Sequence, residues 1–194
     1  MDQITQAIEF AANAFDGRKR KVSHQPAILH SVETGAIASS MTQNKDVLCA
    51  AILHDVLEDT PVTEEILRQQ FGDTVTDLVL SETENKYRDQ PSELTWRRRK
   101  EEALQTLKSH QEKDVMIIFL SDKLSNIRSI HNDLILKGPS IWNEFNQKDP
   151  EEHHWYYRSM AQALSSLRNY PAWQEYDRLV AEVFQEEGSF HYDS

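Results

Sequence analysis

Glycine, proline and cysteine are scarce in this chain of 194 residues, which has five glycines, six prolines and one cysteine. So few helix-breaking residues leave long segments uninterrupted, and apolar residues in those segments recur at the 3.6-residue spacing of an amphipathic helix. The pattern therefore predicts an all-α fold. The single cysteine, Cys49, excludes an intramolecular disulfide and fits a reducing compartment, so we expect a cytoplasmic protein.

Long hydrophobic runs are also missing, and the mean hydropathy is -0.65. No apolar run approaches the roughly 20 residues that a membrane span needs, so we expect no membrane insertion. The first residues, MDQITQAIEFAANAF, carry acids and lack the basic and then apolar regions of a secretory signal. The composition therefore predicts a protein that does not enter the membrane or the secretory route.

Linker sequences are absent too, since no stretch rich in proline, serine or glycine divides the chain and no internal repeat appears. The length suits one globular domain. We therefore predict a single domain over residues 1–194. Within it, residues 133–187 are expected to form C-terminal helices packed on the rest, and residues 188–194 a frayed tail.

Positive charge is in deficit, with 21 lysines and arginines against 32 acidic residues and a formal net charge of -11. Nonspecific binding of nucleic acid needs an extended basic surface, so we expect no nucleic-acid partner. The basic residues concentrate at positions 18–21 and 97–100, and local patches of this kind can hold phosphates. For residues 18–21 the alternative is a solvated loop or a targeting patch, and for residues 97–100 a solvated helix face is favoured.

Apolar periodicity and capping residues divide the chain into helices. The predicted helices cover residues 2–15, 27–41, 46–58, 63–72, 73–81, 92–109, 112–132, 151–169 and 172–186. The helices over 46–58 and 112–132 are so apolar that we expect both to lie near the centre of the domain.

A histidine and an aspartate, His54 and Asp55, interrupt the most apolar of these helices. A buried aspartate is costly without a partner, and adjacent helical residues point about 100° apart, so both side chains can reach one cation beside the helix. His30 and Asp122 lie at the edges of apolar segments and are candidates to complete the site. Two imidazoles and two carboxylates suit a divalent ion such as Mn, Fe, Ni or Zn. The alternative is a His54 that bonds the backbone beside an exposed Asp55.

Further polar side chains follow these residues at helical spacing. Glu58 and Asp59 lie four positions after the His–Asp pair, and a carboxylate pair there can orient or activate a metal-bound water. The alternative is an acidic helix end, which the helix dipole disfavours. Asn126 lies four positions after Asp122 and could contact a substrate sugar, or it could simply be exposed.

Four segments in this order resemble the HD hydrolase domain of RelA/SpoT homologues, and most closely the stand-alone small alarmone hydrolases. They are RKRKVSHQPAILH at 18–30, AAILHDVLEDT at 50–60, FG at 71–72 and FLSDKLSNIRS at 119–129. A lone His–Asp pair is common, whereas this combination is hard to obtain by chance. The resemblance implies an all-α HD-domain helical bundle that uses one divalent metal ion per chain, usually Mn²⁺. It also implies an enzyme that removes pyrophosphate from the 3′ position of guanosine tetra- or pentaphosphate.

The family's functional residues carry over by position. The implied metal ligands are His30, His54, Asp55 and Asp122, and the implied catalytic carboxylates are Glu58 and Asp59. The implied substrate contacts are Arg20, Lys21, Lys86 and Asn126.

Three positions depart from the family pattern, because Ala27 stands where many relatives have tyrosine, Ser31 where they have proline and Phe15 where they often have histidine. The substrate therefore stays open between guanine and adenine alarmones. Alternatives are an HD-family phosphatase acting on NADPH or a 5′-nucleotide, and a catalytically inactive nucleotide-sensing HD protein. The expected partner is a small hyperphosphorylated nucleotide, and a homo-oligomer is left open.

Overall fold

Helices make up the regular secondary structure of the computed structural model, which describes residues 2–87, 89–110 and 112–185. Within these residues no strand forms, and an isolated β-bridge pairs Lys19 with Pro26. The prediction of an all-α fold is therefore confirmed. The tail predicted over residues 188–194 lies outside the described residues. No helix in the described part of the chain is long and apolar enough to cross a membrane.

The helices follow one another through short connections. In chain order they are α1 (Gln3–Ala14), α2 (Ala27–Ser39), α3 (Lys45–Leu53), α4 (Val56–Asp59), α5 (Glu64–Glu82), α6 (Ser92–Ser109), α7 (Lys113–Lys137), η1 (Gly138–Glu144), α8 (Pro150–Ala163), η2 (Ser165–Leu167) and α9 (Pro171–Val183). Of these, η1 and η2 are short 3-10 helices. The ranges predicted over 2–15 and 92–109 agree with α1 and α6.

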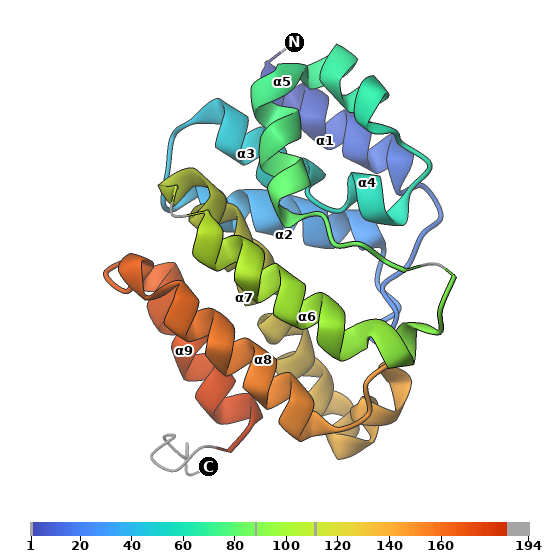
Figure 1. Cartoon of the computed structure of the whole chain (residues 1–194), viewed down its shortest axis with the longest axis vertical. Helices are drawn as coiled ribbons and strands as arrows, with labels where there is room; N and C mark the ends of the chain where they lie inside the picture. Colours follow the sequence, from blue (N-terminus) through green and yellow to red (C-terminus); the bar gives the residue numbers. More distant parts are fainter. Residues whose placement is uncertain (1, 88, 111, 186–194) are drawn as a thin grey trace.

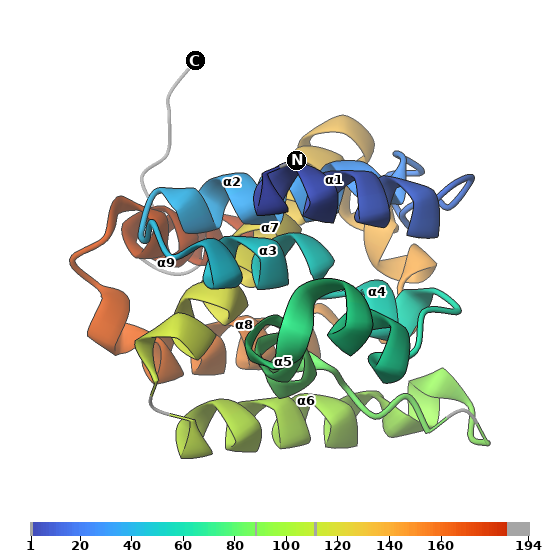
Figure 2. The same ribbon diagram turned by 90° about the horizontal axis from the view of Figure 1, so that it is seen from above.

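Helices α3 and α7 form the centre of the molecule. Every residue from Val47 to Leu53 in α3 and from Val115 to Ser125 in α7 is buried. Helix α7 packs against α2, α3, α5, α6 and α9. Helices α1 to α5 occupy the upper half of Figure 1 and α8 and α9 the lower half, while Figure 2 shows α6 on the opposite side from α1 and α2. The expectation that these two apolar segments lie centrally is confirmed.

The helix predicted over residues 46–58 is divided in two, which corrects the prediction. Helix α3 ends at Leu53 and α4 begins at Val56, with His54 and Asp55 between them. The Nδ1 atom of His54 lies 2.9 Å from the carbonyl oxygen of Ala51, the acceptor that a continuous helix would use for the amide of Asp55. The imidazole therefore competes with the backbone amide of Asp55 for the carbonyl oxygen of Ala51. The helix breaks at His54 and Asp55, the two residues predicted to bind the metal ion.

Two glycines with positive φ set other helix boundaries. Gly72, with φ of 80°, kinks α5 at the point where the sequence predicts a boundary between two short helices. Gly138, with φ of 70°, ends α7 at Lys137, beyond the end predicted at residue 132. The longer α7 matters because it forms one wall of the cavity described below.

The C-terminal helices cover the remaining side of the core. Helix α9 packs along α7, and α8 packs on α6 and α9. The hydroxyl group of the buried Tyr176 donates a hydrogen bond of 2.8 Å to the carbonyl oxygen of Tyr157, which ties α9 to α8. The single domain over 1–194, with C-terminal helices over 133–187 packed on the rest, stays a prediction.

Close packing of α2 on α3 places the two histidines. Gly35 on α2 faces Ile52 on α3 so closely that a Cβ atom at position 35 would overlap the Cγ1 atom of Ile52. The glycine therefore sets the distance between the helix that carries His30 and the helix that ends before His54.

We expect Gly35→Ala to lower the free energy of unfolding by about 1 kcal/mol. The reason is that overpacking costs about 1–3 kcal/mol and exceeds the gain in helix propensity of about 0.5–1 kcal/mol. Urea denaturation followed by circular dichroism measures the change. In an Ile52→Ala background the same substitution should stabilise the protein, because the obstructing side chain is gone. An equal loss in both backgrounds would contradict this account of the α2–α3 contact.

Candidate metal centre and substrate cavity

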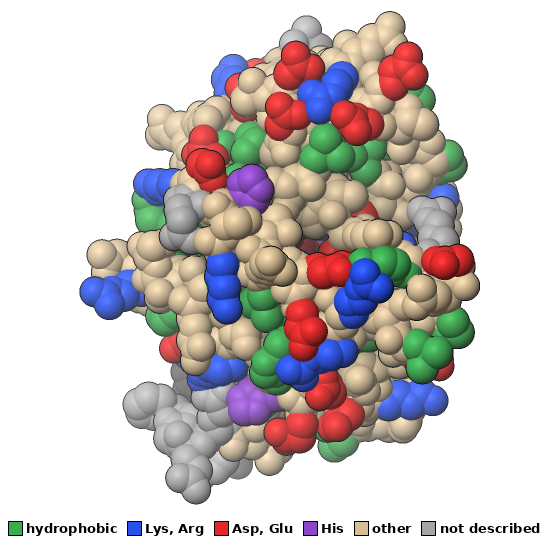
Figure 3. Space-filling view, viewed as in Figure 1, with side chains coloured by type: hydrophobic (Ala, Val, Ile, Leu, Met, Phe, Trp, Pro, Cys, Tyr) green, Lys and Arg blue, Asp and Glu red, His purple; other side chains and the backbone are tan. Residues whose placement is uncertain are grey.

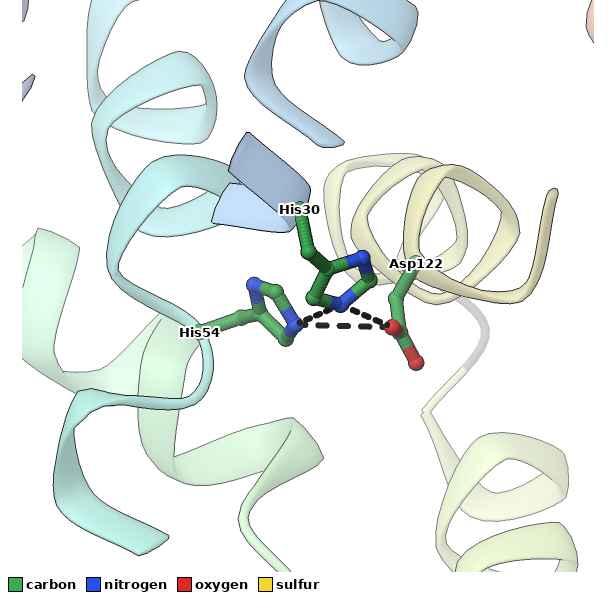
Figure 4. A group of neighbouring side chains, drawn as sticks. All are labelled: His30, His54 and Asp122. Carbon is green, nitrogen blue, oxygen red and sulfur yellow. Dashed lines mark hydrogen bonds and ion pairs between the residues drawn. The ribbon is translucent and has the colours of Figure 1, made fainter. Parts of the chain in front are cut away.

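Two histidines and an aspartate from three parts of the chain meet at one buried point. His30 lies on α2, His54 follows α3 and Asp122 lies on α7, and one ligand atom of each lies within 4.8 Å of the others (Figure 4). The Nε2 atom of His30 lies 3.1 Å from the Nε2 atom of His54 and 3.0 Å from the Oδ1 atom of Asp122. The Oδ2 atom of Asp55 lies 3.2 Å from the Nε2 atom of His54. The structure thus brings together all four predicted ligands.

Burial and charge act in opposite directions on the two histidines. His30, His54 and Asp122 are buried, whereas the side chain of Asp55 is 27% exposed. Burial lowers the pKa of His30, and the carboxylate of Asp122, which favours the charged form of the ring, only partly opposes this. Burial also disfavours the charged form of His54, but the carboxylates of Asp55 and Asp122 outweigh it and raise its pKa well above the usual value. The carboxylates therefore favour the charged imidazolium form of His54, with a proton on each ring nitrogen, when no metal ion is bound.

A buried lysine, Lys123, lies directly behind Asp122. Burial opposes ionisation of Asp122, but the Lys123 ammonium and the two imidazoles hold the pKa of this carboxyl well below its usual range. Lys123 also lies 3.2 Å from the Oε1 atom of the buried Glu82, whose pKa burial raises to about 8. Neither residue was predicted from the sequence, although a lysine inside the apolar segment VMIIFLSDKL was a visible signal for Lys123.

The donor set fits a divalent metal ion. A carbonyl oxygen only accepts hydrogen bonds, so the contact to Ala51 requires a proton on Nδ1 of His54 and leaves Nε2 as the atom that can ligate. Two imidazole nitrogens and two carboxylates around one point are the mixed nitrogen and oxygen ligands that Mn, Fe, Ni and Zn accept. Two carboxylates that lie close together in a largely buried site repel each other, and a bound cation offsets this repulsion.

The second carboxylate pair lies beside this centre and is bridged by a lysine. The Nζ atom of Lys86 lies 3.1 Å from the Oε2 atom of Glu58 and 2.5 Å from the Oδ1 atom of Asp59. The backbone amide of Glu84 donates a 2.6 Å hydrogen bond to the Oε1 atom of Glu58. Burial, together with the charge of Asp55, raises the pKa of Glu58 to about 7. The three predicted residues therefore form one group, with Lys86 on the carboxylates.

A cavity of about 430 Å³ opens onto the metal centre. His30, Asp55 and Asp59 line one part of it, and the basic segment 18–21 lines another. Further lining comes from the aromatic rings of Phe15, Phe145 and Tyr157, from Ala27, and from Asn126, Ser129 and Asp133 on α7. All three positions that depart from the family pattern, 15, 27 and 31, therefore line this cavity. The cavity therefore joins the candidate metal centre to residues 18–21, one of the two basic segments of the sequence that can hold phosphates.

Two of the predicted substrate contacts form a chain from the cavity to the metal centre. The Nη2 atom of Arg20 donates a 2.6 Å hydrogen bond to the Oδ1 atom of Asn126, whose amide nitrogen donates a 2.6 Å bond to the Oδ1 atom of Asp122. Lys21 donates to the side-chain carbonyl oxygen of Asn146. Asn126 is thus held in one orientation from both sides.

The second basic cluster, Arg97–Lys100, lies away from the cavity. It belongs to a face where basic and acidic side chains alternate over α6 (Figure 3). Arg97 and Arg98 are substantially exposed, which agrees with the predicted solvated helix face. Arg99 and Lys100 are instead largely buried against Glu84, so the prediction is wrong for these two residues. Their ion pairs hold the loop that carries the Glu84 amide against Glu58.

We expect Mn²⁺ to bind more tightly as the pH rises above the ordinary imidazole pKa of about 6.5, because the pKa of His54 is raised and His54 must lose its Nε2 proton before that nitrogen can ligate. Calorimetric titrations in buffers of different ionisation heat should show about one proton released per ion. Substituting His131→Gln, on an imidazole outside the site, should leave this proton release unchanged. Binding that does not depend on pH would contradict the arrangement.

Comparison with known proteins gives one family match and several relatives. The family model described as "HD domain" matches residues 7–149. A protein of Escherichia coli O157:H7 named guanosine-3′,5′-bis(diphosphate) 3′-pyrophosphohydrolase is 34% identical over 131 residues. The match covers 66% of this chain but 18% of that protein, so the chain spans less than a fifth of its length.

Two solved structures share the fold. The lmo0812 protein of Listeria monocytogenes EGD-e superposes with a TM-score of 0.71 and 29% identity over 81% of this chain and 99% of its own. A metazoan ortholog of SpoT, described as hydrolysing ppGpp, superposes with a TM-score of 0.73 and 24% identity over 98% of both chains. The family match covers more than half of the chain and includes all four residues of the candidate metal centre. This chain therefore belongs to the HD-domain family.

Proposed function

We propose that this chain is a metal-dependent hydrolase that removes pyrophosphate from the 3′ position of guanosine 3′,5′-bis(diphosphate)-type nucleotides in the cytoplasm. The observation that carries the proposal is that a basic segment, residues 18–21, and the His–Asp centre line the same cavity. The activity named for the Escherichia coli relative supports the choice of reaction. The mixed nitrogen and oxygen donors support one Mn²⁺ per chain.

The proposed ligands are His30, His54, Asp55 and Asp122, and the bound ion supplies Lewis-acid stabilisation of charge on the phosphate oxygens. Glu58 accepts a proton from the attacking water. Its pKa of about 7 is close to the value at which a carboxylate is both ionised and basic enough for this role. Asp59 orients that water from the cavity wall, and Lys86 keeps both carboxylates in place.

The proposed reaction breaks the bond between the ribose O3′ atom and its phosphorus. The oxygen of water bonds to that phosphorus, the proton of the water passes to Glu58, and the departing O3′ atom takes up a proton. The products are pyrophosphate and a nucleoside 5′-diphosphate. Arg20 and Lys21 neutralise phosphate charge from the cavity wall, and Asn126 contacts the ribose.

A carboxylate at the far end of the cavity favours guanine as the base. Asp133 follows Asp122 by 11 positions, so it lies on the same face of α7 about 16 Å further along the helix axis. It is buried, lines the cavity and lies 3.5 Å from Lys137. Guanine presents two N–H donors side by side, at N1 and N2, which a carboxylate can accept together, whereas adenine presents one amino group.

We expect the purified, Mn²⁺-loaded protein to convert ppGpp to GDP and pyrophosphate. Ion-exchange chromatography of parallel incubations with ppGpp, ppApp, NADPH and AMP identifies the products. Orthophosphate from NADPH or AMP alone would favour the phosphatase alternative. Bound metal without any turnover would favour the nucleotide-sensing alternative.

Within the same assay, Glu58→Gln should lower kcat about 10²–10⁴-fold, because the amide cannot accept the proton. The Mn²⁺ affinity should stay within a few-fold of the wild-type value. Glu65→Gln changes an exposed carboxylate on α5 and serves as the matched control, with wild-type kcat.

We expect Asp133→Asn to lower the ratio of kcat/KM for ppGpp to kcat/KM for ppApp about 10-fold to 100-fold, since the amide offers one acceptor in place of two. Steady-state kinetics with both nucleotides measures the ratio. Asn132→Ala, at the exposed neighbouring position, should leave the ratio unchanged. A ratio that stays constant in Asp133→Asn would exclude a role for this carboxylate in base selection.

A further inference from the structure

The side chains of His30, Ser125 and Glu33 form a line of hydrogen bonds that leads away from the metal centre. Its Nδ1 atom, on the side of the ring away from the metal centre, lies 2.7 Å from the hydroxyl oxygen of Ser125. That hydroxyl group in turn donates a 2.7 Å hydrogen bond to the Oε2 atom of Glu33. Ser125 is 2% exposed, so no solvent competes freely for its hydroxyl group.

The direction of this line follows from counting protons. A carboxylate accepts hydrogen bonds and has no proton to donate, so the single proton of the Ser125 hydroxyl points at Glu33. The hydroxyl oxygen can then only accept from His30. The Nδ1 atom of His30 must therefore carry the proton, and the Nε2 atom must carry the lone pair.

The carboxylate of Glu33 is itself held in place by a second ion pair. Arg128 donates a 3.0 Å bond to the Oε1 atom of Glu33, the oxygen that Ser125 does not use. The same guanidinium donates bonds of 2.7 Å and 2.6 Å to the two carboxylate oxygens of Glu175 on α9. This bidentate pairing fixes the plane of Arg128 and, through it, the position of Glu33.

The competing tautomer has an acceptor of its own. A proton on Nε2 of His30 would point at the Oδ1 atom of Asp122, at 3.0 Å. That tautomer would leave Nδ1 and the Ser125 oxygen facing each other as two acceptors, with no proton between them. The hydrogen bond from Ser125 to Glu33 therefore selects the tautomer, because it destabilises only the form of His30 with the proton on Nε2.

We propose that Ser125 and Glu33 are positioning residues that hold His30 as its Nδ1–H tautomer, with the Nε2 lone pair directed at the metal centre. The inference rests on the metal role given to His30 above. Ligating histidines generally bond a partner through their other ring nitrogen, and loss of that partner typically costs 10-fold to 100-fold in metal affinity. Here the carboxylate of Glu33 orients the hydroxyl group of Ser125, and that hydroxyl group orients the ring of His30.

The test compares four variants by two measurements. Nitrogen-15 NMR of the imidazole rings in the metal-free protein reports the tautomer of His30, and calorimetry reports the Mn²⁺ affinity. Ser125→Ala and Glu33→Leu should both lose the pure Nδ1–H form and weaken Mn²⁺ binding about 10-fold to 100-fold. Ser125→Thr keeps the hydroxyl group and should restore both readouts. Ser121→Ala is the matched control.

Ser121 suits this control because it lies one turn earlier on α7, is buried, and donates its hydroxyl proton to the carbonyl oxygen of Ile117 rather than to the site. Its substitution should leave the tautomer and the affinity unchanged. Glu33 is partly exposed, so Glu33→Leu keeps the test decisive if Ser125→Ala fails to fold.

Either of two results would overturn the inference. One is a wild-type His30 that carries its proton on Nε2. The other is an unchanged tautomer and Mn²⁺ affinity in Glu33→Leu. Because both measurements are made without nucleotide, a protein that fails to hydrolyse ppGpp but shows the expected tautomer would refute the proposed function and leave the inference standing.

Discussion

The buried carboxylate of Asp122 is the group around which the functional half of this protein is organised. Its Oδ1 atom lies close to both imidazoles of the metal centre and accepts a hydrogen bond from the amide of Asn126. Lys123 pairs with its other oxygen. An aspartate this deeply buried is costly unless every side of it is occupied. The packing of α2, α3 and α7 supplies those partners, so the fold and the site depend on each other.

Helix α7 gives the cavity its order along one direction. Asp122, Asn126, Ser129 and Asp133 recur at helical spacing on one face, and all of them lie at the metal centre or on the cavity wall. The basic segment 18–21 also lines the cavity, so this acidic chain has a local positive patch beside α7. The helix α7 thus sets the distance between the metal centre at Asp122 and the proposed base contact at Asp133.

Sequence patterns predicted the helices well because few residues interrupt them and the apolar periodicity is strong. They also predicted the four residues of the candidate metal centre, because a histidine or an aspartate buried in an apolar helix is costly unless it has a partner. The pattern failed at residues 46–58. Periodicity describes which face of a helix is buried, but it does not reveal that the ring of His54 takes the carbonyl group of Ala51 and ends the helix.

By itself, therefore, the sequence determined the all-α class, the family resemblance and the residue types of the centre, since these follow from local spacing and composition. Only the tertiary structure decided which distant groups stand behind those residues. Ser125 on α7 contacts His30 and Glu33 on α2, and Glu82 on α5 contacts Lys123, the residue next to Asp122 on α7. Their contacts depend on how α2, α5 and α7 cross, and helix crossing is set by packing across the whole core rather than by any local pattern.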